Sequence, residues 1–218
     1  RLSIDMGDIG TIAYDNGSGS GLATIDDKTP TAAEEIWDGL DTSTSGRVGA
    51  AGSTGVFNYV ATFEGITVNA AARKGSGTAN TDGASSNAGQ GAMDIAITTD
   101  GSMLGVDGLA IGAGYGEAEN GSAADTTGGD DAHMTAFANY SVGPVTFGYQ
   151  QSYIHNNISG TDDQDAKRWG VAFNINENLS VSYGEADTTF KGGLGTTGDV
   201  KENIEGVAVA YTMGSMKI

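Results

Sequence analysis

The 218-residue sequence contains no cysteine and only two prolines, and it lacks any long uninterrupted apolar run. The absence of cysteine excludes a disulfide framework and thiolate chemistry. Without about 18 consecutive apolar residues the chain has no transmembrane helix. A membrane is not excluded, because the strands of a membrane barrel need only about 9–11 residues of alternating character.

Basic residues are also scarce. The chain has 10 Lys and Arg against 28 Asp and Glu, which gives a formal net charge of −18. Phosphate backbones are bound by clustered Lys and Arg, so nucleic acid is not an expected partner. Acidity that serves only solubility would be the simplest explanation of this balance.

Most of the chain consists of short segments with strand-like alternation. Phe57, Tyr59 and Phe63, for example, alternate with Asn58 and Thr62. The connections between segments alternate in length, with long ones at 75–90, 155–165 and 188–202 and short ones at 143–144, 176–178 and 214–215. Long loops at one end and tight turns at the other are typical of a membrane β-barrel.

The two faces of these segments differ. One face carries the large apolar residues, and aromatics lie near the strand ends, as interfacial girdles require: Tyr115, Tyr140, Tyr149, Tyr153, Trp169, Tyr183 and Tyr211. The other face is rich in Gly, Ala, Ser, Thr, Asn, Asp and Arg. We interpret that face as too small and polar for a dry core, which favours a water-filled lumen.

The segment 15–44 interrupts the alternation. It is acidic, with a single Lys28, and connections of this length usually carry function. Thr31 and Glu34 have the spacing of a capping box, which predicts a helical turn at 31–37. Its acidic residues are Asp26, Asp27, Glu34, Glu35, Asp38 and Asp41.

Two hairpins, RLSIDMGDIGTIAYDN before this segment and GVAVAYTMGSMKI at the other end of the chain, carry a resemblance to Gram-negative general diffusion porins of the alphaproteobacterial kind. The resemblance implies an all-β fold, a transmembrane antiparallel up-and-down barrel with about 16 strands in the full protein and about 12 here. It implies one domain, 1–218, truncated at both ends, with 15–44 as a constriction loop folded inside the barrel. It also implies an outer-membrane homotrimer in contact with lipid, passing small hydrophilic solutes without enzymatic activity.

In such porins loop acids face basic residues of the barrel wall. We say that a residue has lumen parity when the alternation places it on the small, polar face of its strand. Arg1, Arg73 and Arg168 have lumen parity, and Asp5 and Asp94 lie on the same face. Arg47 follows the loop. Because so few basic residues oppose six acids, we expect a cation-preferring channel.

A secreted or surface-layer β protein, acidic, stabilised by Ca²⁺ and structural or adhesive in role, is the alternative. Asp162, Asp163 and Asp165 offer oxygen ligands suited to a structural Ca²⁺, although their spacing matches no EF-hand and solvated loop tips explain them more simply. A barrel specific for one sugar or phosphate is a third reading. No HExxH or GxSxG pattern supports an enzyme, and no cofactor is expected.

Overall fold

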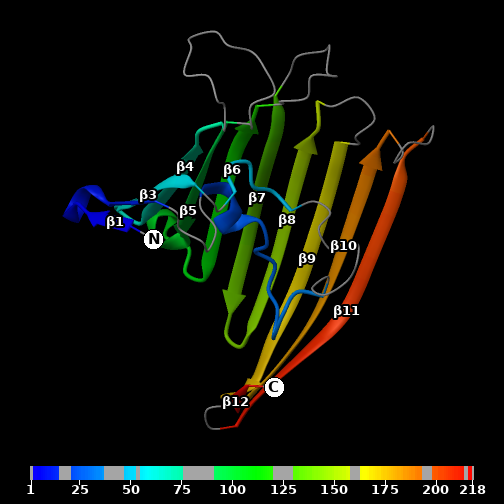
Figure 1. Cartoon of the computed structure of the whole chain (residues 1–218). Coiled ribbons are helices and arrows are strands. Elements are labelled where there is room, and N and C mark those ends of the chain that lie inside the picture. The colour runs from blue at the N-terminus through cyan, green and yellow to red at the C-terminus, as the bar shows by residue number, and fades with distance from the viewer. Residues whose placement is uncertain are drawn as a thin grey trace, which may run out of the picture.

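The computed structural model describes residues 2–14, 21–36, 47–52, 55–75, 91–119, 130–157, 163–192, 198–213 and 216–217. These residues form one antiparallel sheet of 12 strands whose spatial order is their chain order (Figure 1). The strands are β1 (Leu2–Asp5), β2 (Thr11–Tyr14), β3 (Val56–Phe63), β4 (Ile66–Arg73), β5 (Ala92–Asp100), β6 (Leu109–Ala118), β7 (Asp131–Val142), β8 (Val145–His155), β9 (Asp163–Asn176), β10 (Leu179–Lys191), β11 (Val200–Met213) and β12 (Met216–Lys217).

This up-and-down order confirms the predicted fold class and the prediction of about twelve strands. The sheet curves strongly and has a hollow side, which we call the inner face (Figure 1). Within the described residues the sheet is open, since β1 pairs only with β2 and β12 only with β11. No helix in the described part of the chain is long and apolar enough to span a membrane.

The connections alternate in length as predicted. Gly143–Pro144 and Glu177–Asn178 make two-residue turns at one end of the sheet, and Gly143 has a left-handed φ of +55°. Two of the long connections at the opposite end are shorter than the sequence suggested. Pairing of β8 with β9 and of β10 with β11 extends further, so these connections cover 156–162 and 192–199 rather than 155–165 and 188–202.

The outer face is apolar, as the alternation predicts. Val207, Leu2 and Met93 are among its most exposed side chains, with Val207 exposed to 70%. The next residue in β11, Ala208, lies on the inner face and is half-buried. A broad apolar outer surface on an antiparallel sheet is what a membrane barrel presents to lipid.

The inner face is less uniformly polar than expected. Phe137 and Ile154 project from it and pack with residues that lie over the sheet in one buried cluster: Leu22, Ile25, Val48, Ala96, Phe137 and Ile154. The expectation that this face is too small and polar for a dry core was therefore wrong at this place. Apolar side chains are needed where part of the segment between β2 and β3 covers the wall and excludes water.

The segment between β2 and β3 also lacks the expected helical turn at 31–37 in its described part. Instead a 3₁₀-helix, η2, covers Gly21–Ile25. The Thr31 hydroxyl donates to the Glu34 carbonyl at 2.7 Å, whereas in a capping box it would accept a bond from the Glu34 N–H. Two further 3₁₀-helices, η1 (Gly7–Ile9) and η3 (Gly101–Leu104), lie in turns between strands.

Candidate functional site

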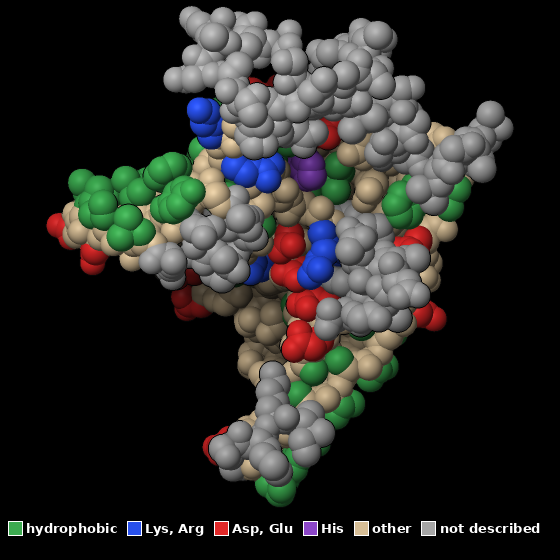
Figure 2. All heavy atoms as spheres, in the orientation of Figure 1, with side chains coloured by type: hydrophobic (Ala, Val, Ile, Leu, Met, Phe, Trp, Pro, Cys, Tyr) green, Lys and Arg blue, Asp and Glu red, His purple; other side chains and the backbone are tan. Residues whose placement is uncertain are grey.

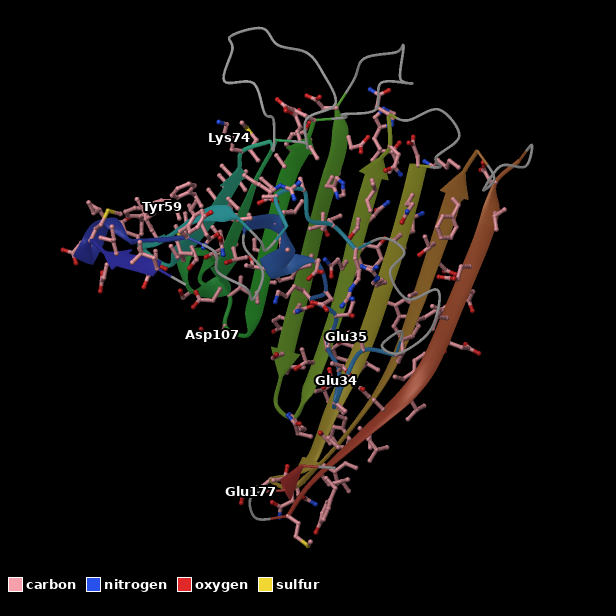
Figure 3. All side chains as sticks on the ribbon, in the orientation of Figure 1. Glu34, Glu35, Tyr59, Lys74, Asp107 and Glu177 are labelled. Atoms are coloured by element: carbon pink, nitrogen blue, oxygen red, sulfur yellow. The ribbon has the colours of Figure 1, made fainter. Side chains whose placement is uncertain are left out.

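Residues 21–36 and 47–52, which we call the inner segment, lie across the inner face of the sheet. In Figure 3, Glu34 and Glu35 lie in front of the strands, between the turn that carries Glu177 and the strand end that carries Lys74. Contacts with strands from β3 to β11 hold the inner segment in this place.

The first anchor is Asp94 on β5, whose side chain binds both ends of the inner segment. One carboxylate oxygen accepts the Leu22 N–H at 2.9 Å, and the other accepts the Ala51 N–H at 2.8 Å. The residue is only 5% exposed, so these bonds replace water that the carboxylate has lost. A single wall residue therefore fixes the point where the segment leaves the wall and the point where it returns.

Gly21 begins the inner segment in a left-handed conformation, with φ of +54°. Its N–H is shared between the side-chain oxygens of Asn58, at 3.1 Å, and Asn69, at 2.8 Å. A Cβ at this position would overlap the Asp94 carboxylate. Glycine is therefore required here by both backbone conformation and space.

The second anchor is Gln150 on β8, which is fully buried. Its carbonyl oxygen accepts the Lys28 N–H at 2.6 Å, and its amide donates to the Ile25 carbonyl at 2.7 Å and to the Thr135 hydroxyl at 2.9 Å. Next to it, the Asn139 amide donates to the Lys28 carbonyl at 2.6 Å. Both N–H and carbonyl groups of the inner segment's backbone are thus hydrogen-bonded to side chains of the wall.

A third anchor lies further along the sheet, on β10. The buried Ser182 hydroxyl accepts the Ala32 N–H at 2.9 Å and lies 3.5 Å from the Thr31 hydroxyl. At the other end of the inner segment the Gly49 N–H donates to Nδ1 of His133 on β7 at 3.3 Å. Six strands, β3, β4, β5, β7, β8 and β10, therefore supply side chains that bind its backbone.

The charged groups of the inner segment form a mixed cluster, and Figure 2 shows acidic and basic side chains gathered near the middle of this face. Arg47 lies 3.9 Å from the Asp26 carboxylate and 3.4 Å from that of Asp27. From the wall, Nη1 of Arg168 on β9 donates to the Asp26 carbonyl at 3.2 Å. Two guanidinium groups therefore stand beside the Asp26–Asp27 pair.

These surroundings shift the pKa values of two of the acids. Burial, followed by the charge of Asp27, raises the pKa of Asp26 to about 6, and the charge of Arg47 offsets part of the effect. Burial also raises the pKa of Glu35, and the charges of Asp27 and Glu34 act in the same direction. Partial desolvation beside like charges is the ordinary cause of such shifts.

The structure brings together several of the predicted site residues. Asp26, Asp27, Glu34 and Glu35 all lie on the inner segment with Arg47, and Arg168 lies beneath it. Asp94 is on the inner face as predicted and binds the segment's backbone.

The remaining predicted residues lie at the η1 turn, near Gly52 at the end of the inner segment, or outside the described residues. Asp5 is exposed at the η1 turn, where it accepts the Gly7 N–H at 2.9 Å. Arg73 is half-buried at the end of β4, near Gly52. Arg1, Asp38 and Asp41 lie outside the described residues.

The candidate calcium ligands have other partners. Asp163 accepts bonds from the Tyr153 hydroxyl at 2.9 Å and the Asn156 N–H at 3.0 Å, and it lies 3.0 Å from His155 Nδ1. Asp165 accepts from Gln151 at 3.0 Å. Asp162 lies outside the described residues, among which no three His, Asp or Glu gather where they could hold a metal ion.

The uncharged anchors were not singled out from the sequence: Asn58, Asn69, Asn139, Gln150 and Ser182. The sequence pattern nevertheless indicates these residues, because each has lumen parity in a strand whose large apolar side chains lie on the other face. An amide at such a position can satisfy one donor and one acceptor of a passing backbone.

Comparison with known proteins gives a consistent result. A family model described as Gram-negative porin matches residues 2–216. Among curated proteins there was no match.

Three solved structures with a similar fold are distant in sequence. The outer membrane protein OmpT of Vibrio cholerae, in its trimer form, is 14% identical with a TM-score of 0.65, and the match covers 95% of this chain and 63% of OmpT. OmpF of Salmonella typhi, in a complex with daunomycin, is 12% identical with a TM-score of 0.65, covering 95% and 64%. A porin refined at 1.8 Å is 14% identical with a TM-score of 0.62, covering 96% and 69%. The chain thus spans about 63% of the length of OmpT.

Proposed function

Since the chain belongs to the Gram-negative porin family, we propose that it forms a water-filled channel for passive diffusion of small hydrophilic solutes and ions, with a preference for cations. Its location is the bacterial outer membrane, and its fold is that of an outer-membrane barrel. No catalytic step is part of this proposal.

The observation that supports the channel best is the position of the inner segment. A segment bonded to β5, β7, β8, β9 and β10 lies over the hollow side of a curved sheet and leaves less open space there. In a closed barrel the same segment would narrow the lumen, so we propose that it is the constriction loop. Narrow passages lined by charged side chains select ions by sign.

The sign of that selection follows from the charges in the described part of the segment. Asp26, Asp27, Glu34 and Glu35 outnumber the basic residues Lys28, Arg47 and Arg168. At pH values where all four carboxylates are ionised, the narrow part carries net negative charge and attracts cations. Asp38 and Asp41 would strengthen this preference if they line the same passage.

We also propose a homotrimer as the functional assembly. The basis is the likeness in fold to OmpT of Vibrio cholerae, whose structure is described as a trimer form. The exposed apolar outer face of the described strands would be shared between lipid and neighbouring copies.

The test is planar-bilayer conductance of the purified protein in a salt gradient, comparing the parent with Glu34→Gln/Glu35→Gln. We expect steps in multiples of three, a reversal potential that shows cation preference, and a smaller preference in the variant. The matched control is Glu185→Gln/Glu205→Gln, which removes two carboxylates from the outer face beside Trp169 and Tyr183. A detergent-free soluble monomer without channel activity would contradict the proposal and favour the surface-protein alternative.

A further inference from the structure

The inner face carries a row of glycines that runs across four neighbouring strands. Gly148 on β8 is the direct partner of Gly170 on β9, Gly170 is the partner of Gly184 on β10, and Gly184 is the partner of Gly206 on β11. Asn139 on β7 pairs with Gly148 and continues the same row. We call Gly148, Gly170, Gly184 and Gly206 the glycine row.

The inner segment follows this row from strand to strand. Its Lys28 carbonyl accepts the Asn139 amide, which is the first position of the row. Pro30 lies over Gly148 and Gly170, and Ile36 lies over Gly184 and Gly206. Residues 28–36 therefore cross five strands at one level of the wall instead of running along any strand.

The inner segment lies closer to Gly148 and Gly170 than to Gly184 and Gly206. A Cβ on Gly148 would overlap both the side-chain oxygen of Asn139 and the Pro30 ring, and a Cβ on Gly170 would lie 2.7 Å from the Pro30 carbonyl oxygen. On Gly206 it would lie 3.2 Å from Ile36 Cγ2, and on Gly184 no closer than 3.6 Å to Ile36. A glycine inside a strand gives up side-chain packing and backbone entropy, and it often marks a close approach of another backbone.

We infer that the glycine row is a positioning element that sets how close residues 28–36 lie to the wall and therefore the bore of the channel. The inference rests on the proposed function, because the bore matters only if the inner segment narrows a passage. A Cβ at Gly170 meets the backbone of Pro30 alone, so it has to displace Pro30, and displacement away from the wall is displacement toward the hollow side. The polar anchors Gln150 and Asn139 fix where the segment lies along the strands, and the glycines fix its height above them.

Gly170→Ala and Gly184→Ala provide a matched pair. The two residues are direct cross-strand partners, and the substitution is the same, but only the first places a methyl group against the Pro30 backbone. We expect Gly170→Ala to lower single-channel conductance by roughly 1.5-fold, since the narrowest part controls passage. Gly184→Ala should conduct like the parent, because its methyl group would make ordinary contacts.

A second pair uses Pro30, in case Gly170→Ala does not fold. Gly148→Ala meets the ring of Pro30 and the side-chain oxygen of Asn139, so Pro30→Ala relieves one of the two overlaps and should restore part of the lost conductance. Gly170→Ala meets the backbone oxygen, so Pro30→Ala should not restore it. Heat-modifiable mobility in gel electrophoresis shows for each variant whether the barrel has folded.

The measurement is single-channel conductance of the full-length protein in planar bilayers. Reduced conductance in folded Gly170→Ala or Gly148→Ala, with normal conductance in Gly184→Ala, supports the positioning role. Folded variants that all conduct at least as well as the parent overturn it while leaving the channel proposal intact. If the folded parent itself forms no channels, the proposed function has failed.

Discussion

Arg168 reaches from β9 to the backbone of Asp26, with Nη1 3.2 Å from the Asp26 carbonyl oxygen. The guanidinium is almost completely covered, since only 2% of the residue is exposed. It therefore has two effects at once. It ties the inner segment to the wall, and it places a positive charge beside the carboxylates of Asp26 and Asp27, where charge is poorly screened.

We expect Arg168→Gln to increase cation preference and to loosen the inner segment. Loss of a charged donor to a partly buried carbonyl, which keeps its bond from the Gln150 amide at 3.2 Å, should reduce the stability of this attachment by about 1 kcal/mol. Reversal potential in a salt gradient and protease sensitivity of residues 21–36 measure the two effects. Lys167→Gln is the control, because Lys167 is the preceding residue on β9 and is exposed on the outer face. Equal reversal potentials in the two variants would contradict a role for Arg168 at the passage.

Cation preference should fall with acidification. The pKa of Asp26 is raised to about 6, mainly by burial, and that of Glu35 is also raised, so the segment loses negative charge as the pH falls toward 5. Folding binds the Asp26 proton more tightly, so the stability contributed by this group is greatest at low pH and is lost as the pH rises through about 6.

Reversal potentials measured from pH 7.5 to pH 5, in about half-unit steps, test this expectation. Asp26→Asn should flatten the dependence near pH 6 and show a weaker preference above it. Asp187→Asn is the control, because Asp187 is exposed and its carboxylate accepts the Asn203 amide at 2.8 Å, away from the inner segment. If Asp26→Asn keeps the full pH dependence, Asp26 does not set it.

The strands and the two faces could be predicted from the sequence because alternation is a local signal. Phe57 and Asn58, or Trp169 and Arg168, are neighbours in the chain, and a strand sends such neighbours to opposite faces. The placement of Asp26, Asp27, Glu34 and Glu35 over the inner face followed from the resemblance and the acidity of one long segment.

The anchors could not be predicted because they are long-range. Asp94 binds Leu22 and Ala51, which are 72 and 43 residues away in sequence, and no periodicity records such a contact. The helical turn at 31–37 was expected from a local capping pattern, but Ser182 on β10 offers the Ala32 N–H another partner. Phe137 and Ile154 have lumen parity, and only the fold shows that Leu22 and Ile25 cover them.

Asp94→Asn should release one end of the inner segment. An amide keeps one acceptor oxygen but turns its NH₂ group toward the other backbone N–H, which leaves a buried donor without a partner at a cost of about 1–3 kcal/mol. We expect noisier channels with more frequent partial closures and faster proteolysis within 21–52. Asp187→Asn again serves as the control. Quiet, parent-like channels would show that Gln150 and Ser182 hold the segment without Asp94.

A charge introduced on the apolar outer face should destabilise the folded protein, and two neighbouring residues on β11 allow a test. Val207 is 70% exposed on the apolar face, and Ala208 lies on the inner face. If the outer face contacts lipid, Val207→Arg places a guanidinium in the hydrocarbon layer, at a cost of about 2–4 kcal/mol near the membrane midplane. Ala208→Arg adds the same group to the inner face, which is in contact with water in the proposed channel, and should reduce the free energy of unfolding far less. Denaturant titration of folding into lipid vesicles measures both, and equal losses would mean that β11 does not face lipid, since only lipid contact makes the two substitutions differ.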